Sequence, residues 1–420
     1  MVVKTLEQST EKRSARAWLM VAASMFAVAW GGNEFTPLLV MYRLDHGHSP
    51  VMVDFFLFAY VVGIVPALLL GGPLSDRLGR RPLMLPAPLI AIAGSTLLAF
   101  GADSAAILIL GRILCGIALG LGMAVGGSWV KELSTAPWDS AASDGAGARR
   151  AAMSLTAGFA LGAGFAGVLA QWAPLPEALA YVLHIAITAA AGIALWRAPE
   201  TREAQPIDAR RRLIDDLKIP AAGHRRFLYV VVPLAPWVFG AASVGYAVIP
   251  ALMTGHSGDA PVAFSAFLCV VALTCGFAIQ SLGRKIDTDL SARGAVVALV
   301  FLVIGMAGAA LVASTLTVAV AVIAAAILGC GYGMALVSGL LEIQRIAGPD
   351  DLAGLTAVFY SITYVGFAVP AVLAMLSESI PALTYPLMLL FGSAAAAACL
   401  LVVLLKSRSH LPSGSELARR

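Results

Sequence analysis

Apolar runs of about twenty residues alternate with short polar segments along the whole chain. A bilayer core is about 30 Å thick, so a helix needs about 20 apolar residues to cross it. Backbone groups inside lipid must pair within their own segment, which predicts helices rather than open strands. The windows that meet this length are 17–41, 52–72, 83–102, 105–130, 150–172, 179–197, 227–251, 262–282, 294–314, 317–341, 354–376 and 382–405.

The longest polar stretch, Glu200 to Arg226, divides these windows into two groups of six. A short pattern recurs in the two groups: Gly, six residues, Gly and two basic residues, at Gly72–Arg81 and again at Gly276–Lys285. Internal repeats of this kind are typical of secondary transporters. The pattern predicts an all-α membrane protein with twelve transmembrane helices in two pseudo-symmetric six-helix bundles. Its expected parts are a tail (1–16), a first bundle (17–199), a central loop (200–226), a second bundle (227–405) and a tail (406–420).

Composition supports a membrane protein and offers no catalytic chemistry. Of 420 residues, 60% are hydrophobic and only 12% are charged, whereas soluble proteins keep about a quarter charged. The five cysteines lie in apolar runs without zinc-ligand spacing, and no phosphate loop or nucleophile elbow is present. We therefore expect no enzyme activity, metal or cofactor, and a proton or substrate gradient as the energy source. The expected partners are a small-molecule substrate and membrane lipids, with no nucleic acid, and the expected state is a monomer.

The distribution of basic residues predicts the orientation of the helices. With the N-terminus in the cytoplasm, all but two of the 28 Lys and Arg residues fall in cytoplasmic segments. The exceptions are Arg43, in an external loop, and Arg112, inside a helix. Basic residues are retained on the cytoplasmic side of membranes. We therefore expect a multi-pass protein with both termini in the cytoplasm, and the excess of arginine over lysine suggests a bacterial cytoplasmic membrane.

The loop "GGPLSDRLGRRPLM" after the second window combines three glycines with an acid and three bases. It resembles the signature loop between helices two and three of the major facilitator superfamily. The resemblance extends over nearly the whole chain and implies two bundles that work by alternating access. It also implies that this charge cluster latches the protein in one state. The residues concerned are Gly72, Asp76, Arg77, Gly79, Arg80 and Arg81.

Two ionisable residues lie inside the first group of windows, Glu34 and Arg112. Each is expected about 10 Å below the outer face, at 1.5 Å per residue, so a direct or relayed pairing is possible. A buried charge in a membrane is costly and indicates function by default, although a structural ion pair is the alternative. Arg112 and the glycines after it resemble the helix-four motif of proton-coupled members of the superfamily. The segment around Glu34 resembles helix one of bacterial multidrug/proton antiporters, which implies proton coupling by these two residues.

Other candidates carry less specific patterns. Gly158, Gly162 and Gly167 resemble an antiporter motif in helix five, but Ala163 stands where the motif has proline, and a generic packing face explains them equally well. His184 is a possible proton relay, with a hydrogen-bonded structural histidine favoured. We expect Asp54, Glu342 and Arg345 at the membrane interface rather than buried. The residues expected to line a substrate cavity are Asn33, Trp237, Tyr246, Tyr360 and Tyr364.

These features favour a secondary transporter that exports small amphiphilic or cationic compounds in exchange for protons. The first alternative is a proton-coupled importer of a sugar, an organic acid or another nutrient. The second alternative is a membrane sensor or lipid-handling protein on the same fold, which would show no proton-coupled flux of substrate.

Overall fold

The computed structural model describes residues 16–143, 145–203, 219–348, 351–409 and 411. The predictions for the two tails and for most of the central loop therefore lie outside the described residues. In the described residues, ten helices are long and apolar enough to cross a membrane, and a shorter apolar helix spans Leu179–Leu195. The remaining predicted window, 17–41, is occupied by two consecutive helices. The prediction of an all-α protein with twelve membrane helices is confirmed.

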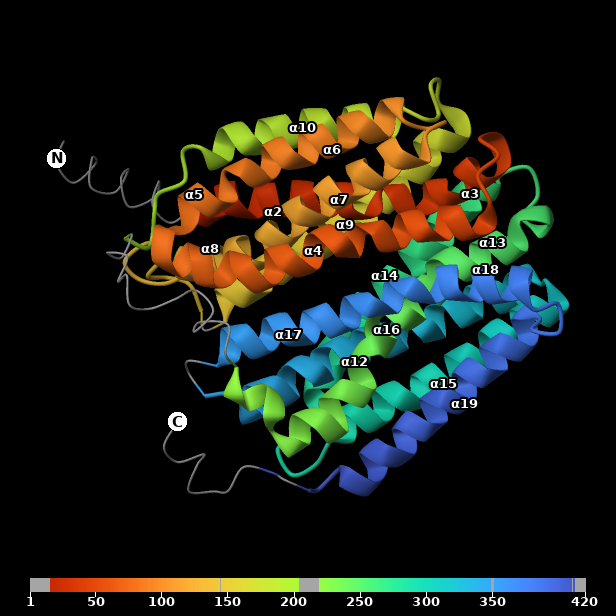
Figure 1. Cartoon of the computed structure of the whole chain (residues 1–420). Helices are drawn as coiled ribbons and strands as arrows, with labels where there is room; N and C mark the ends of the chain where they lie inside the picture. Colours follow the sequence, from red (N-terminus) through yellow and green to blue (C-terminus); the bar gives the residue numbers. More distant parts are fainter. Residues whose placement is uncertain (1–15, 144, 204–218, 349–350, 410, 412–420) are drawn as a thin grey trace. The chain divides into compact units, whose positions relative to one another are not determined.

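Figure 1 shows the helices in chain order. The first six windows contain α2 (Ala17–Asn33), α3 (Phe35–Asp45), α4 (Pro50–Leu78), α5 (Arg80–Met84), α6 (Pro86–Phe100), α7 (Ala105–Leu121), η1 (Gly122–Gly126), α8 (Gly127–Glu132), α9 (Ala146–Trp172) and α10 (Leu179–Leu195). The later windows contain η3 (Phe227–Val231), α12 (Val232–Ser243), η4 (Val244–Val248), α13 (Ile249–Met253), α14 (Pro261–Ile286), α15 (Arg293–Thr315), α16 (Val318–Ile346), α17 (Leu352–Val365), η6 (Gly366–Ala368), α18 (Val369–Ser379) and α19 (Tyr385–Lys406). Short 3₁₀ turns at Pro220–Gly223 (η2) and Thr254–His256 (η5) complete the order.

The first membrane helix is interrupted at Glu34. Pro37 has no backbone N–H, so the carbonyl of Asn33 lacks the partner that a continuous helix would give it four residues later. α2 therefore ends at Asn33, and the Glu34 N–H still bonds to the Trp30 carbonyl at 2.9 Å. α3 begins at Phe35. The sequence thus places an ionisable side chain at the junction between two helical segments.

Contacts divide the chain into two compact units. Unit 1 groups residues from 1–35, 62–169 and 173–216, and unit 2 groups those from 36–61, 170–172 and 217–420. This grouping by contacts does not test the predicted bundle boundaries at 199 and 227, which stay a prediction. It assigns α3 from Thr36 onward and the first part of α4 to unit 2.

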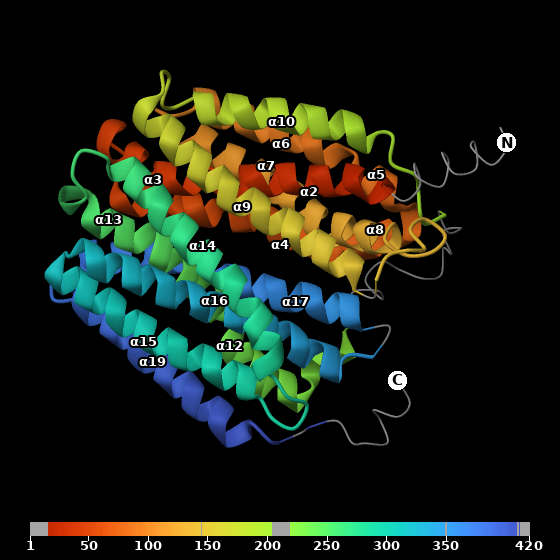
Figure 2. The same ribbon diagram turned by 180° about the vertical axis from the view of Figure 1, so that it is seen from behind.

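Within unit 1, α2, α6, α7 and α10 pack together, and Figures 1 and 2 show α6 and α10 side by side in both views. Glycines permit these close approaches, as expected for helices in lipid. A Cβ on Gly94 of α6 would lie 3.0 Å from the Gly111 carbonyl of α7. A Cβ on Gly31 of α2 would lie 2.4 Å from the His184 ring of α10. The helices therefore pack closely near the C-terminal end of α2.

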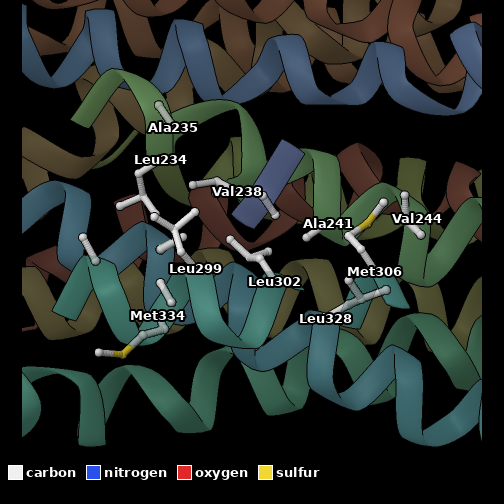
Figure 3. Close-up of a cluster of buried hydrophobic side chains, with 14 of the residues drawn as sticks. Leu234, Ala235, Val238, Ala241, Val244, Leu299, Leu302, Met306, Leu328 and Met334 are labelled. Carbon is white, nitrogen blue, oxygen red and sulfur yellow. The ribbon is translucent and has the colours of Figure 1, made fainter. Parts of the chain in front are cut away.

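Unit 2 has a continuous apolar core formed by α12, α15 and α16. Figure 3 shows Leu234 and Val238 of α12 facing Leu299 and Leu302 of α15, with Leu328 of α16 beside them. Close approach also joins α14 to α16, because a Cβ on Gly329 would lie 2.2 Å from the Ala272 carbonyl. This core contains aliphatic side chains in the middle of the helices.

The two copies of the glycine repeat adopt different backbones. Gly79 has φ +95° and separates α4 from α5, a conformation that favours glycine. Its counterpart Gly283 lies inside α14, which continues to Ile286. A Cβ on Gly283 would meet Met334 and Val337 of α16 at 2.8 Å. The first glycine therefore makes a turn, and the second permits helix packing.

Candidate functional site

Glu34 is fully buried in unit 1, at the junction between α2 and α3. Its Oε1 accepts a hydrogen bond from the Ser95 hydroxyl of α6 at 3.2 Å and lies 3.4 Å from Nδ1 of His184 on α10. Trp30 lies close to the carboxyl group, but Oε2 has no partner in hydrogen-bond geometry among the described residues. An orphaned carboxyl oxygen inside a membrane is costly, so this group is poised for a proton or another ligand.

Arg112 of α7 is buried close enough to Glu34 to act on it electrostatically. Its Nη1 donates to the Gly32 carbonyl at 3.3 Å, and its guanidinium lies 4.7 Å from the centre of the Phe35 ring. The structure thus brings together the two ionisable residues singled out in the first half. Arg112 keeps backbone and ring contacts that do not depend on the charge of Glu34.

His184 is hydrogen-bonded on both sides of its ring and is fully buried. Its Nε2 lies 3.0 Å from the Ala27 carbonyl and 2.9 Å from the Thr188 hydroxyl, while its Nδ1 lies 2.7 Å from Ser95 Oγ. The histidine is therefore held as the structural interpretation expects, but it is also connected to Glu34. Sequence reasoning missed Ser95 completely, because a serine in an apolar helix is an ordinary packing residue.

Asn33 of α2 and the glycines of α9 lie where these two helices of unit 1 pack together. The Asn33 side chain donates to the Phe159 carbonyl of α9 at 3.1 Å. Cβ atoms on Gly158 and Gly162 would lie 2.3 and 2.5 Å from backbone carbonyls of α2, and Gly167 is also buried. Gly158 and Gly162 thus let α9 approach α2, and the Asn33 side chain binds the backbone of α9.

The signature loop forms an ion-pair cluster centred on Arg80. Arg80 is buried and binds Asp76 at 2.8 Å, Glu132 at 2.6 Å and the Ser75 hydroxyl at 2.6 Å. Glu132, at the end of α8, also accepts from the Thr201 hydroxyl at 2.5 Å. These contacts connect α4, α5, α8 and the segment after α10, so the cluster holds these helix ends together.

The backbone of the same loop is held by Glu200. Its two carboxylate oxygens accept hydrogen bonds from the backbone N–H groups of Arg80 and Arg81, each at 2.9 Å. A carboxylate at these first N–H groups of α5 is favourable, because they have no partner within the helix. The Arg81 guanidinium binds the Trp196 carbonyl at 2.9 Å. Sequence reasoning missed Glu132 and Glu200, although both are acids at the ends of apolar windows.

Two residues of the predicted latch lie beside this cluster rather than at its centre. Gly72 lies inside α4, and a Cβ there would meet nothing within 4 Å. Arg77 is half-buried near the end of α4. Both therefore belong to the helix that carries Asp76.

Aromatic rings gather in unit 2 where α12 meets α17 and η6. Phe239 stacks on Tyr364 at 4.4 Å and on Phe367 at 4.8 Å between ring centres. Tyr332 lies 5.9 Å from Phe239, and Tyr246 lies 6.5 Å from Phe367. We call these five residues the aromatic cluster. Phe239 and Phe367, its centre, were missed, although each lies two or three residues after a predicted aromatic.

The other two predicted cavity aromatics lie outside this group. Trp237 donates from Nε1 to Cys399 Sγ of α19 at 3.5 Å, so its side chain is directed to another helix. The Tyr360 ring packs at 5.8 Å from Phe359, which belongs to the apolar core.

The prediction that Asp54 and Glu342 are interfacial rather than buried is wrong. Asp54 is buried in unit 2 and pairs with Arg43 at 3.1 Å. Glu342 is 1% exposed and binds Arg226 through both oxygens, at 2.5 and 2.8 Å. Arg345, also less exposed than expected, binds Glu342 at 2.8 Å and Asp287. A bidentate pair with Arg226 neutralises Glu342, and a single contact with Arg43 pairs Asp54, which explains how these acids are buried.

No group of three or more His, Cys, Asp or Glu side chains is arranged to hold a metal ion in the described part of the chain. The chemistry available in unit 1 is therefore that of a carboxyl, a hydroxyl, an imidazole and a guanidinium.

Comparison with known proteins agrees with this architecture. A solved POT family transporter in complex with 5-aminolevulinic acid matches with a TM-score of 0.76 at 12% identity, over 95% of this chain and 97% of the other. A D-xylose-proton symporter matches with a TM-score of 0.68 at 14% identity, over 92% and 96% of the two chains. These likenesses concern the fold.

At the level of sequence, the chain is similar to a chloramphenicol resistance protein from Pseudomonas aeruginosa. The two are 27% identical over 345 residues, which is 79% of this chain and 77% of the relative. The model of the Major Facilitator Superfamily matches residues 18–371. A family of membrane transporters thus accounts for the helices, the signature loop and the fold, and the chain belongs to the Major Facilitator Superfamily.

Proposed function

We propose that this transporter exports small amphiphilic or cationic compounds in exchange for protons. The observation that carries the proposal is Glu34, a fully buried carboxyl inside the membrane helices with one oxygen lacking a hydrogen-bond partner among the described residues. An ionisable group at that depth is costly, and such groups mark substrate and proton pathways in membrane proteins. The likeness to a chloramphenicol resistance protein supports export and makes chloramphenicol the first compound to test.

The proposed cycle uses the charge of Glu34 as its switch. Protonation of Glu34 removes a buried negative charge and weakens its attraction to Arg112 or to a cationic substrate. Release of the proton restores that attraction. Arg112 remains in place in both conditions because it also contacts the Gly32 carbonyl and the Phe35 ring. The exchange of a proton for substrate follows from this competition.

Unit 2 has a separate proposed substrate contact of its own. The stacked rings of Phe239, Tyr364 and Phe367 suit an aromatic or cationic compound, because such rings bind both kinds of group. Asn33, Trp237, Tyr246 and Tyr360 stay proposed substrate contacts, with the aromatic cluster as the stronger candidate. The Arg80 cluster is proposed to stabilise one of the two states of alternating access.

The distribution of basic residues supports a bacterial cytoplasmic membrane with both termini in the cytoplasm, and we propose that the transporter works as a monomer. On this orientation the Arg80 cluster lies at the cytoplasmic end of unit 1.

Purified protein in liposomes with an imposed pH gradient tests the proposed function. Labelled chloramphenicol and ethidium are the probes, and a pH-sensitive dye follows the protons. Antiport predicts proton flux opposite to the flux of probe, reduced in Glu34→Gln to the level of protein-free liposomes. Glu378→Gln, which removes an exposed carboxylate at the end of α18, is the matched control.

Three other results separate the alternatives. Proton and probe moving in the same direction would support the importer. Flux of neither probe would favour the sensor or lipid-handling protein. Normal coupled transport by Glu34→Gln would remove Glu34 from the mechanism.

A further inference from the structure

Glu34, Ser95 and His184 form a continuous hydrogen-bonded chain across three helices of unit 1. The chain runs from Glu34 Oε1 to Ser95 Oγ at 3.2 Å and from Ser95 Oγ to His184 Nδ1 at 2.7 Å. All three side chains are fully buried. A buried structural histidine needs one partner on each ring nitrogen, which Ala27 and Ser95 would supply. The 3.4 Å approach of Nδ1 to Glu34 Oε1 is additional. This approach therefore needs its own explanation.

The surroundings of His184 indicate which ring nitrogen carries a hydrogen. Nε2 lies 3.0 Å from the Ala27 carbonyl, which can only accept a hydrogen bond. A hydrogen on Nε2 satisfies this carbonyl in both the neutral and the charged ring, and the relay proposed below uses this tautomer. In the neutral ring Nδ1 is then an acceptor, directed at Ser95 Oγ. This tautomer is favoured by a contact on the side of the ring away from Glu34.

Counting hydrogens along the chain leaves room for one more proton. With Glu34 ionised and His184 neutral, the single Ser95 hydrogen faces two acceptors, Glu34 Oε1 and His184 Nδ1. One of these two contacts then lacks a hydrogen. With one proton added, every contact is satisfied in either of two arrangements. The proton may be on Glu34, which donates to Ser95, which donates to His184, or on His184, which donates to Ser95, which donates to Glu34.

We propose that Ser95 and His184 extend the proton site of Glu34 into a three-residue relay, in which His184 is the second holder of the transported proton. In the transfer, the Glu34 O–H gives its proton to Ser95 Oγ while the Ser95 hydrogen passes to His184 Nδ1. The products are a carboxylate, an unchanged hydroxyl and an imidazolium, so one proton moves and total charge is conserved. This inference rests on the proposed proton coupling and adds the residues through which the proton passes.

The neighbouring ionisable groups are few. α6 carries none, and α2 carries none besides the Glu34 that ends it. α7 contributes Arg112, which acts on Glu34, and Cys115, whose sulfur lies near Ser95 and Gly94. α10 contributes Tyr181 one turn before His184. α9 has Arg149 and Arg150 near its start, far along the helix from the Gly158 and Gly162 that contact α2. Arg112 is thus the one permanent charge beside the relay in the described residues.

The first test uses purified protein without substrate. Infrared spectra follow the carboxyl band of Glu34, identified by its loss in Glu34→Gln, and nitrogen NMR follows His184 in the same pH series. A relay predicts that the two groups titrate together, as a coupled pair. In Ser95→Ala the two groups keep their electrostatic interaction across 3.4 Å, but the proton should move between them more slowly, which the line shape of the His184 nitrogen signals reports. Ser95→Thr keeps the hydroxyl and should keep the fast exchange.

A matched control separates a relay from a purely structural histidine. Thr188→Val perturbs Nε2, on the other side of the His184 ring, and should leave the coupled titration unchanged. His184→Gln retains hydrogen-bonding groups but cannot take the proton, so the Glu34 titration should become that of a single independent group. If Ser95→Ala does not yield folded protein, His184→Gln against Thr188→Val decides the question in the same measurements.

The second test uses liposomes and chloramphenicol. Ser95→Ala and His184→Gln should lower proton-driven accumulation roughly tenfold or more, while exchange of labelled for unlabelled probe without a gradient stays within about twofold of wild type. The relay would be overturned if Ser95→Ala and His184→Gln were both indistinguishable from Thr188→Val in titration and in transport coupling. Coupled transport that persists in Glu34→Gln would instead overturn the proposed function, while the substrate-free titration would still report on the three residues.

Discussion

Both units bury ion pairs near helix ends, such as those of Arg80 in unit 1 and Glu342 in unit 2, but in the described residues unit 1 also buries charged residues within its helices. In unit 1, Glu34 and Arg112 lie within the helices, among Ser95 and His184. In unit 2, Arg226 precedes η3 and Glu342 lies four residues before the end of α16, while the middle of the unit is aliphatic and aromatic. The Glu342 carboxylate is fully neutralised by arginine, whereas Glu34 retains an oxygen with no partner in the described residues.

This difference indicates two uses of buried charge. A fully paired acid at a helix end adds little to transport, because its protonation would leave the buried Arg226 without its carboxylate partner. A partly satisfied acid in the middle of the membrane can change its charge at lower cost to the rest of the structure. We therefore expect unit 1 to carry the proton and unit 2 to hold its charges permanently.

The largest expected effect comes from making the same substitution in both units. Glu342→Gln leaves Arg226 and Arg345 buried beside a neutral amide, which should cost about 3–5 kcal/mol of unfolding free energy. Glu34→Gln should cost about 1 kcal/mol or less, because Arg112 keeps its other contacts. Denaturant titration of both variants in the same mixed micelles measures the difference.

Asp289→Ala is the control for unit 2. Its carboxylate also binds Arg345, at 3.2 Å, but its side chain is 82% exposed, so its loss should change stability by about 0–1 kcal/mol. Equal losses in Glu342→Gln and Glu34→Gln would contradict the division of roles drawn from the comparison.

A smaller effect is expected at the glycine repeat. Gly79→Ala forces a side chain into a backbone with φ +95° and places its Cβ 2.9 Å from Glu200 Oε2, which should cost about 1–3 kcal/mol. Gly72→Ala, where a Cβ meets nothing within 4 Å, should be neutral or stabilising, since alanine favours a helix. Thermal unfolding in detergent compares the two. If Gly72→Ala were destabilised and Gly79→Ala were not, the positive-φ turn at Gly79 would not be the reason for the glycine in the repeat.

The smallest effect concerns the aromatic cluster. Phe239→Leu removes two stacked ring contacts and should cost about 0.5–1.5 kcal/mol for each, together with a severalfold weaker binding of chloramphenicol. Phe391→Leu is the control, because this ring of α19 is largely exposed at the protein surface. Calorimetry of unfolding and of probe binding tests both statements. Unchanged binding in a folded Phe239→Leu would assign the cluster to packing alone.

Much of the fold could be predicted from the sequence because length and hydropathy determine membrane helices directly. Glu34 and Arg112 were also predictable, since ionisable residues inside apolar windows are rare. Ser95 and His184 could not be connected to Glu34 in the same way. They lie 61 and about 150 residues further along the chain, and a hydroxyl in an apolar helix gives no signal until helix packing brings it to a partner.

Glu342 shows a second limit of the sequence. Its place near the end of a window predicted a position near a helix end, where the structure has it, but position along a helix does not determine burial. Burial came from Arg226, 116 positions earlier, which lies at the edge of the central polar stretch and looked like one of many cytoplasmic bases. Glu200 was hidden for a related reason, because it acts on the backbone of another loop rather than on a neighbouring charge.

The close contact between Gly31 and the His184 ring carries a consequence for evolution. Any side chain at position 31 would displace the imidazole, so the two positions cannot change independently. Lineages that retain the histidine should therefore retain the glycine. Those that lost the histidine are free to accept alanine or serine at position 31. Gly31, which has no side chain and takes no part in the chemistry, should therefore vary together with His184 among related sequences.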